Sequence, residues 1–195
     1  MSYISTPETY TYPWFMRLLF RMQRRRYGRE LESVKLWGRI PGAFLAMVTM
    51  YRVLDRKSSP IEPALRSLIQ TRVSQINWCA FCIDFNSAIG LGRGVSEEKL
   101  GALPQFEESS QFSEREKAAL AYAEAITYSD RRVDAGLMSR LHGYFDDQAI
   151  IELTALIAYQ NMSSKFNAAL GVPAQGFCSL PVQESRQLPA TDENR

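Results

Sequence analysis

Two of the three cysteines in the sequence, Cys79 and Cys82, are separated by only two residues. On a helix this spacing puts both side chains on one face, where the sulfurs can close a disulfide or act as attacking and resolving thiols. Two buried cysteines that only pack as small hydrophobic side chains, without redox chemistry, can have the same spacing. Zinc needs two further ligands. With one histidine, His142, and no second cysteine pair, we expect no metal site.

The reactivity of such a pair depends on its place in a helix. A helix is predicted to begin near Cys79, because Asn77 and Trp78 interrupt the preceding helical pattern. The first helical turn has unpaired N–H groups and a partial positive charge, which favour a thiolate. This effect is strongest at Cys79 and weaker at Cys82. Nearby aromatic side chains are expected to shield the pair partly from water: Trp78, Phe81 and Phe85.

The elements that position this pair are predicted to be helices. Strand signals are scarce, and no run of β-branched residues alternates with polar ones. The clearest helix start is Ser113, which has Glu116 at the spacing of a capping box. Apolar spacing and boundary residues predict helices over residues 14–27, 41–54, 61–76, 79 to 90 or 92, 114–128, 134–141 and 146–170, with a short helix before Pro104. The fold class is therefore all-α.

One helical domain accounts for most of the 195 residues. We assign residues 40–173 to this core, residues 1–39 to an arm and a basic amphipathic helix, and residues 174–195 to a tail, disordered or laid on a neighbour. In the basic helix, one apolar face is expected to be buried on the core or on another subunit: Trp14, Phe15, Leu18, Leu19 and Met22.

Charge and hydropathy restrict the partners and the compartment. The net charge of +2 does not point to nucleic acid, and despite the arginines around residues 17–29 we expect neither nucleic acid nor a membrane surface as a partner. The longest apolar stretch, residues 43–51, is much shorter than the ~20 residues of a spanning helix. No secretory signal is visible. We therefore predict a cytoplasmic protein.

Three segments around these features resemble the alkylhydroperoxidase D-like and carboxymuconolactone decarboxylase-like family. They are residues 63–82, which end in the CxxC pair, residues 113–127, and residues 151–171. The resemblance covers about residues 40–173. It implies a single-domain, alkylhydroperoxidase D-like helical bundle with the CxxC at a helix start. It also implies a homo-oligomer (dimer, trimer or hexamer) and the reduction of peroxides by a cycling cysteine pair.

The chain departs from the family's redox motif at two positions. The motif has a glutamate twelve residues before the first cysteine, where this chain has Ser67, and a histidine four residues after the second, where it has Asn86. Asparagine can hydrogen-bond but cannot titrate. Glu124 is a candidate to replace the missing base, and Asp84 is expected to be solvated or paired with the helix dipole. We therefore include Ser67, Asn86 and Glu124 with the two cysteines as candidate catalytic residues.

The resemblance and the helix-start argument favour different attacking thiols. The family's relay serves the second cysteine, which favours Cys82, whereas the helix terminus favours Cys79. We assign the reaction with peroxide to Cys82 and regard Cys79 as the more exposed exchange partner.

The function predicted on this basis is that of a thiol-dependent peroxidase or disulfide reductase without a cofactor. Its partners would be a small-molecule hydroperoxide and a thiol or disulfide reductant protein. A redox-sensing or scaffold oligomer and a carboxymuconolactone-type decarboxylase remain alternatives.

Overall fold

The structure, a computed structural model, describes residues 2–5, 7 and 10–179. Within this part of the chain all regular structure is helical, as the sequence predicts. The helices are α1 (Trp14–Tyr27), α2 (Glu32–Trp37), α3 (Pro41–Leu54), α4 (Pro63–Ile76), α5 (Ala80–Gly92), α6 (Glu97–Gly101), the short 3₁₀ helix η1 (Leu103–Gln105), α7 (Glu114–Thr127), α8 (Ala135–His142) and α9 (Asp147–Ala169).

Local signals explain where several helices begin. Ser113 and Glu116 bond to each other's backbone N–H groups, and this capping box starts α7. Asp146 caps α9 by accepting from the N–H of Ala149. Helix α4 begins at Pro63, two residues later than expected, because proline suits the first helical position, which needs no N–H partner.

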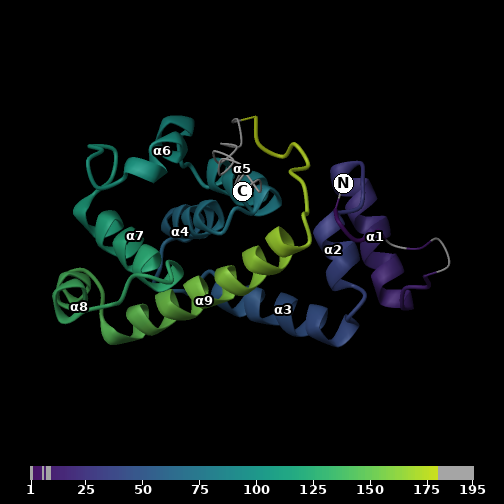
Figure 1. Cartoon of the computed structure of the whole chain (residues 1–195), viewed down its shortest axis with the longest axis horizontal. Coiled ribbons are helices and arrows are strands. Elements are labelled where there is room, and N and C mark those ends of the chain that lie inside the picture. The colour runs from purple at the N-terminus through teal and green to yellow at the C-terminus, as the bar shows by residue number, and fades with distance from the viewer. Residues whose placement is uncertain (1, 6, 8–9, 180–195) are drawn as a thin grey trace, which may run out of the picture.

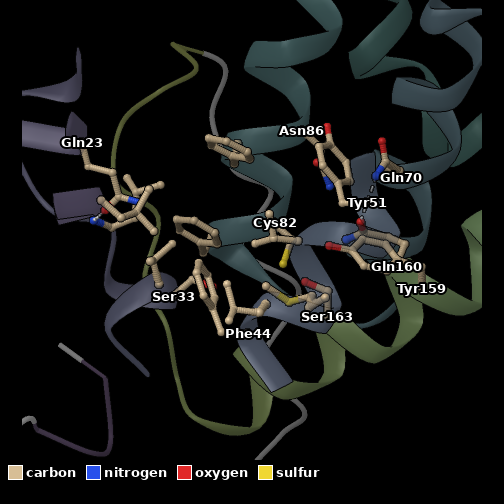
Figure 2. A pocket seen from close by; sticks show the side chains of 18 of the residues that line it. Gln23, Ser33, Phe44, Tyr51, Gln70, Cys82, Asn86, Tyr159, Gln160 and Ser163 are labelled. Atoms are coloured by element: carbon tan, nitrogen blue, oxygen red, sulfur yellow. Dashed lines mark hydrogen bonds between the residues drawn. The ribbon is translucent and has the colours of Figure 1, made fainter. Parts of the chain in front are cut away.

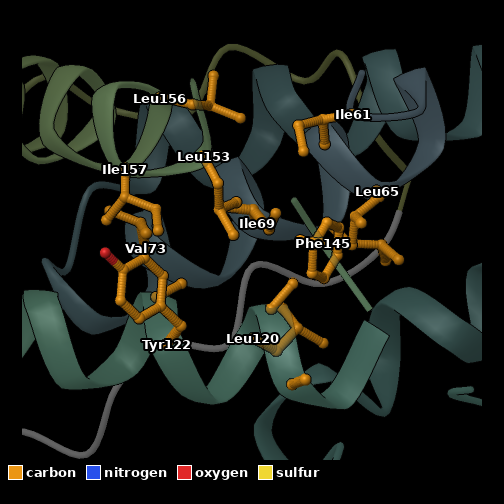
Figure 3. Close-up of a cluster of buried hydrophobic side chains, with 14 of the residues drawn as sticks. Ile61, Leu65, Ile69, Val73, Leu120, Tyr122, Phe145, Leu153, Leu156 and Ile157 are labelled. Carbon is orange, nitrogen blue, oxygen red and sulfur yellow. The ribbon is translucent and has the colours of Figure 1, made fainter. Parts of the chain in front are cut away.

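Helix α4 forms the centre of the fold and packs against α5, α7 and α9 (Figure 1). Its residues 65–74 are all buried, because neighbours cover it on every side. Figure 3 shows the apolar cluster that α4 forms with α7 and α9. Its fully buried members include Ile69, Val73, Leu120, Leu153 and Ile157. This cluster surrounds α4 on the side of α7 and α9, and α5 packs on α4.

The first three helices form a separate layer beside α9 (Figure 1). Met16 and Phe20 of α1 pack with Phe44 of α3 and with Trp37 of α2, which stacks on Phe166 of α9 at 3.9 Å between ring centroids. The predicted buried face of α1 is wrong in part: Trp14, Leu18 and Met22 are 72%, 50% and 58% exposed. Helix α1 is rotated so that Met16, Phe20 and Gln23 face inward.

The chain returns over α5 after α9 ends. Residues 172–179, here called the C-terminal strap, lie between α5 and the N-terminal helices (Figure 1). Of the predicted N-terminal arm, residues 1, 6, 8 and 9 lie outside the described residues, as do residues 180–195 of the predicted tail. None of the helices described is both long and apolar enough to cross a bilayer.

Candidate active site

A tight turn positions the cysteine pair at the start of α5. Helix α4 ends at Ile76, and Trp78 adopts a left-handed conformation with φ of 57°, which few non-glycine residues adopt. This turn lets α5 fold back onto α4. Cys79 caps α5, its sulfur accepting a hydrogen bond from the N–H of Cys82 at 3.2 Å. The two cysteines form a disulfide, as their spacing allows.

Both sulfurs are covered by protein. Cys79 is 0% exposed and Cys82 is 4% exposed. The expectation that Cys79 is the more exposed of the two is therefore wrong. Cys79 lies in an apolar cluster with Leu31, which caps α2, Leu36 within α2, and Val172 of the C-terminal strap. Helix α2 was not predicted, because a six-residue helix shows too little periodicity.

A pocket of about 470 Å³ reaches one cysteine but not the other. Cys82 lies in its wall, whereas Cys79 is not among the residues that line it. Helices α1, α2 and α3 form one side of the pocket, and α4, α5 and α9 form the other. Figure 2 shows the Cys82 side chain between these two sides. A small molecule in this pocket would therefore meet Cys82 first.

Amide side chains gather at one end of the pocket (Figure 2). Asn86 Nδ2 donates to Ser74 Oγ at 3.2 Å, and Gln160 Nε2 donates to the same oxygen at 2.9 Å. Gln70 donates to Gln160 Oε1 at 3.4 Å, while Ser74 donates to the Gln70 carbonyl. Asn86 thus lies at the pocket, where the family motif has a histidine, but its network contains no group that titrates near neutral pH.

Two phenols complete this polar end. Tyr51 and Tyr159 line the pocket with their ring centroids 5.9 Å apart. Burial, with a smaller effect from the negative charge of Asp55, raises the pKa of Tyr51 to about 12. Burial also raises the pKa of Tyr159. Both phenols therefore stay protonated at neutral pH and can donate hydrogen bonds.

One residue that contacts the Cys82 sulfur was not predicted from the sequence. Asn167, near the end of α9, donates from Nδ2 to Cys82 Sγ at 3.4 Å, and its other amide atom, Oδ1, is buried without a hydrogen-bond partner among the described residues. Its only signal was its place in the third matching segment, six residues after Asn161. Asn161 itself donates to Thr127 and accepts from Asn77.

Ser67 and Glu124 do not line the pocket. Ser67 Oγ accepts a hydrogen bond from Arg93, which also pairs with Asp55. The Glu124 carboxylate is bound by Arg72 at 2.8 and 2.5 Å and by Arg131 at 2.5 Å. The structure therefore places Cys79 at the N-cap of α5 and Cys82 and Asn86 within α5, while Ser67 and Glu124 lie in separate polar clusters.

Asp84 fastens the C-terminal strap to the helix that carries the cysteines. It is almost fully buried and accepts backbone N–H bonds from Gln175, Phe177 and Cys178 at 2.7 to 2.8 Å. The expectation of a solvated or dipole-paired Asp84 is wrong, because the strap supplies three donors. Among the described residues, no group of three histidine, cysteine, aspartate or glutamate side chains is arranged to hold a metal ion.

A bacterial relative matches this chain along almost its whole length. The uncharacterized protein YnjA of Escherichia coli K12 is 42% identical over 173 residues, which are 89% of this chain and 95% of the relative. The sequence profile of the carboxymuconolactone decarboxylase family matches residues 41–125. The chain belongs to this family. Within this chain, the matched residues include α3, α4, α5 and the cysteine pair.

Solved structures share the fold of this family member. An uncharacterized peroxidase-related protein with an alkylhydroperoxidase AhpD core, from Ralstonia eutropha JMP134, superposes with a TM-score of 0.78 at 18% identity, over 90% of this chain and 94% of the other. The debrominase Bmp8 superposes with a TM-score of 0.73 at 24% identity, over 89% and 95%. The resemblance seen in the sequence, and the alkylhydroperoxidase D-like helical fold that it implied, are confirmed.

Proposed function

We propose that this protein is a thiol-dependent reductase of organic hydroperoxides, with Cys82 as the attacking thiol and Cys79 as the resolving thiol. One observation carries the proposal: Cys82 lies in the wall of a pocket, whereas its disulfide partner, Cys79, does not line that pocket. The roles of Ser67 and Glu124 as catalytic residues are not part of this mechanism, because neither lines the pocket.

The reaction needs two displacements at sulfur. The Cys82 thiolate attacks the terminal oxygen of the hydroperoxide, so that an S–O bond forms, the O–O bond breaks, and the alkoxide leaves and takes up a proton to become the alcohol. The Cys79 thiolate then attacks the Cys82 sulfur, so that the S–S bond forms and hydroxide leaves as water after protonation. An external dithiol, oxidised in turn to its disulfide, returns the pair to the thiol state.

Two neutral features favour the Cys82 thiolate. Cys82 lies in the first turn of α5, where unpaired N–H groups stabilise negative charge. Asn167 donates a hydrogen bond to its sulfur, and the same donor would stabilise the thiolate once the disulfide is reduced. The family's glutamate and histidine positions supply no base here. Since general acid–base assistance is typically worth about 10²–10⁴ in rate, we expect slower turnover than in relay-containing members.

Single-turnover oxidation tests this proposal. Reduced Cys178→Ser protein, which lacks the third thiol, is mixed with cumene hydroperoxide, and thiols and cumyl alcohol are counted. We expect two thiols lost per alcohol formed, at a rate above that of a free thiol. In the Cys79→Ser variant we expect a sulfenic acid on Cys82, which dimedone traps. Oxidation no faster than that of free cysteine would instead support a redox-sensing or scaffold oligomer.

The uncharged pocket wall also favours a second candidate, reductive dehalogenation of a neutral ring. The Cys82 thiolate would attack a bromine, so that S–Br forms and C–Br breaks, and the ring carbanion takes up a proton. Cys79 would then displace bromide and give the same disulfide. Bromide release from a brominated pyrrole measures this activity. A carboxymuconolactone-type decarboxylation is less well supported, because no arginine or lysine among the described residues lines the pocket to pair with a carboxylate.

A further inference from the structure

The C-terminal strap contributes to the apolar cluster that encloses the disulfide. Its Val172 belongs to the same cluster as Cys79, and its Phe177 packs against that cluster. The strap lies between α5 and the N-terminal helices (Figure 1). Because Cys79 is 0% exposed and does not line the pocket, a reagent reaches its sulfur only where these covering residues move apart.

Asp84 attaches the strap to α5. Its side chain is buried, and the backbone N–H groups of Gln175, Phe177 and Cys178 are the donors that reach its carboxylate among the described residues. A hydrogen bond to a charged acceptor is roughly twice as strong as one between neutral groups. A buried carboxylate that lost these donors would be left without compensation, which is costly. The closed strap and this carboxylate therefore stabilise each other.

The strap is also attached to the N-terminal helices. Gln175 Oε1 accepts a hydrogen bond at 3.0 Å from the N–H of Glu32, the first residue of α2. The Phe177 ring meets Tyr27 of α1 and Phe85 of α5 edge-on, with ring centroids 5.4 and 5.5 Å apart. The strap therefore links α5 to α1 and α2 across the cluster that contains the disulfide.

The two sulfurs of the disulfide differ in access and in how well they leave. A disulfide is reduced when a thiolate attacks one of its sulfurs, and access helps to decide which one. Cys82 borders the pocket, whereas Cys79 does not and shares its cluster with the strap. Cys79 is also well placed to leave, because its sulfur caps α5 and accepts the Cys82 N–H at 3.2 Å. A more stable thiolate leaves faster.

We infer that Asp84 is a positioning residue that decides which sulfur of the oxidised pair the electron donor attacks. By holding the strap over Cys79, it directs a donor thiolate to Cys82. The bond between the donor sulfur and Cys82 forms, the Cys79–Cys82 bond breaks, and Cys79 leaves as a thiolate. The second donor thiolate then attacks the donor sulfur of this mixed disulfide and releases the Cys82 thiolate, so that the two protons of the donor dithiol end on the protein pair. The inference concerns the regeneration step and rests on the proposed function.

Single-thiol variants measure the access of each sulfur. Cys82→Ser/Cys178→Ser keeps only the Cys79 thiol, and Cys79→Ser/Cys178→Ser keeps only the Cys82 thiol. Each protein is mixed with dipyridyl disulfide, a neutral reagent, and the absorbance of the released pyridinethione gives the rate. We expect the Cys79 thiol to react at least about tenfold more slowly than the Cys82 thiol, because access limits thiol–disulfide exchange. Equal rates would overturn the inference.

Release of the strap should change the two rates unequally. Asp84→Ala, introduced into both single-thiol proteins, should raise the Cys79 rate at least about tenfold and leave the Cys82 rate within about threefold, because it removes the anchor of a locally closed state. Leu153→Ala is the matched control, since it destabilises the fold in the separate cluster of α4, α7 and α9. If Asp84→Ala raised the Cys79 rate no more than Leu153→Ala does, the inference would be wrong.

Phe177→Ala is a second way to open the strap, and it leaves the donors of Asp84 in place. We expect it to raise the Cys79 rate at least about threefold, because it removes the ring contacts with Tyr27 and Phe85. Thermal melting verifies that each variant folds, and Phe177→Ala decides the outcome if Asp84→Ala does not.

The site of attack on the disulfide is a separate readout, which a general loss of stability would not shift. Oxidised Cys178→Ser protein is mixed with 2-mercaptoethanol and quenched with N-ethylmaleimide, and tandem mass spectrometry locates the mercaptoethanol adduct. We expect at least about nine tenths of the adduct on Cys82, and at least about a threefold larger Cys79 share when Asp84→Ala is added. An adduct mainly on Cys79 in the parent, or a ratio that Asp84→Ala leaves unchanged, would contradict the assignment.

The two proposals fail in different ways, because none of these exchange measurements uses a hydroperoxide. If the adduct forms on Cys82 and Asp84→Ala redirects it, but the reduced protein does not consume cumene hydroperoxide, the reductase function is wrong and the role of Asp84 holds. If the protein consumes cumene hydroperoxide with two thiols lost per alcohol, but the adduct forms mainly on Cys79, the role of Asp84 is wrong and the reductase function holds.

Discussion

The two sides of the α4–α5 pair differ in how completely side chains fill the space beside them. On the side of α7 and α9, residues such as Leu68, Leu120 and Leu153 are fully buried in one continuous cluster. On the side of α1, α2 and α3, two smaller clusters leave a cavity of about 470 Å³. Close packing on the first side stabilises the fold. The second side is less completely filled, and its cavity reaches a cysteine sulfur.

The largest expected effect concerns the cavity side. Cys82→Ser should reduce hydroperoxide turnover by at least about 10³-fold, in line with the loss of nucleophiles in other covalent enzymes. The urea midpoint of the reduced protein should change little, because serine is nearly isosteric. Steady-state alcohol formation and urea titration measure the two quantities. If Cys82→Ser kept more than one tenth of the parent turnover, the attack would be assigned to Cys79. The cavity would then not be the place where the peroxide reacts.

A matched pair of leucines compares the two sides in stability. Leu153→Ala should lower the free energy of unfolding by about 2–5 kcal/mol, because it opens a cavity in a closely packed cluster. Leu19→Ala should cost less than half as much, because Leu19 is only partly buried and already borders empty space. Urea unfolding of both variants checks this. Equal losses would show that the N-terminal layer is as closely packed as the core.

Asn86→His restores a titratable group on the cavity side. Since residue 86 lies one turn after Cys82 on α5, a neutral imidazole can accept the thiol proton. We expect thiol oxidation by cumene hydroperoxide to become about tenfold faster or more, with a new inflection near pH 6.5. Stopped-flow measurement between pH 5.5 and about 8.5 checks both. Asn86→Gln is the control, and a pH profile identical to that of the parent would argue against activation through this position.

Glu124 provides a test on the filled side. Glu124→Gln removes the charge that Arg72 and Arg131 bind, and it should lower the free energy of unfolding by about 1–3 kcal/mol. The rate of hydroperoxide reduction should stay within about twofold of the parent. A rate loss comparable to that of Cys82→Ser, with the stability unchanged, would restore Glu124 as a catalytic candidate.

The smallest expected effect is on the pH dependence of stability. The pKa of Tyr51 is raised to about 12, above the ~10 of an unfolded chain, so the fold favours the neutral phenol. This contribution is complete below pH 10 and is lost as pH rises towards 12. Tyr51→Phe should therefore make stability fall less steeply in that window, with Tyr159→Phe as a comparison. Urea midpoints between pH 9 and about 11.5 measure the slopes.

The sequence predicted those parts of the fold and site that depend on neighbouring residues. The α7 start at Ser113 and the α5 start beside Cys79 follow from caps and breaks a few residues long. The disulfide needs only the three-residue spacing of its cysteines. These features could be predicted without knowing which helices meet.

The remaining features depend on residues far apart in the chain. Asn167 contacts Cys82 across 85 positions, and Asp84 binds the C-terminal strap across more than 90. The burial of Cys79 depends on α2, which is too short for its periodicity to be recognised. The orientation of α1 was also missed, because apolar residues occupy both its inner and outer faces and spacing alone does not identify the buried one.

The covering of the cysteine pair has a consequence for the order of events in a catalytic cycle. With α2 and the strap lying over Cys79, oxidant and reductant would both approach Cys82 through the same opening, at different times. This predicts ping-pong kinetics, with parallel lines in double-reciprocal plots and inhibition when excess hydroperoxide occupies the oxidised form. It also favours an electron donor with a slender dithiol arm over one that presents a flat protein face.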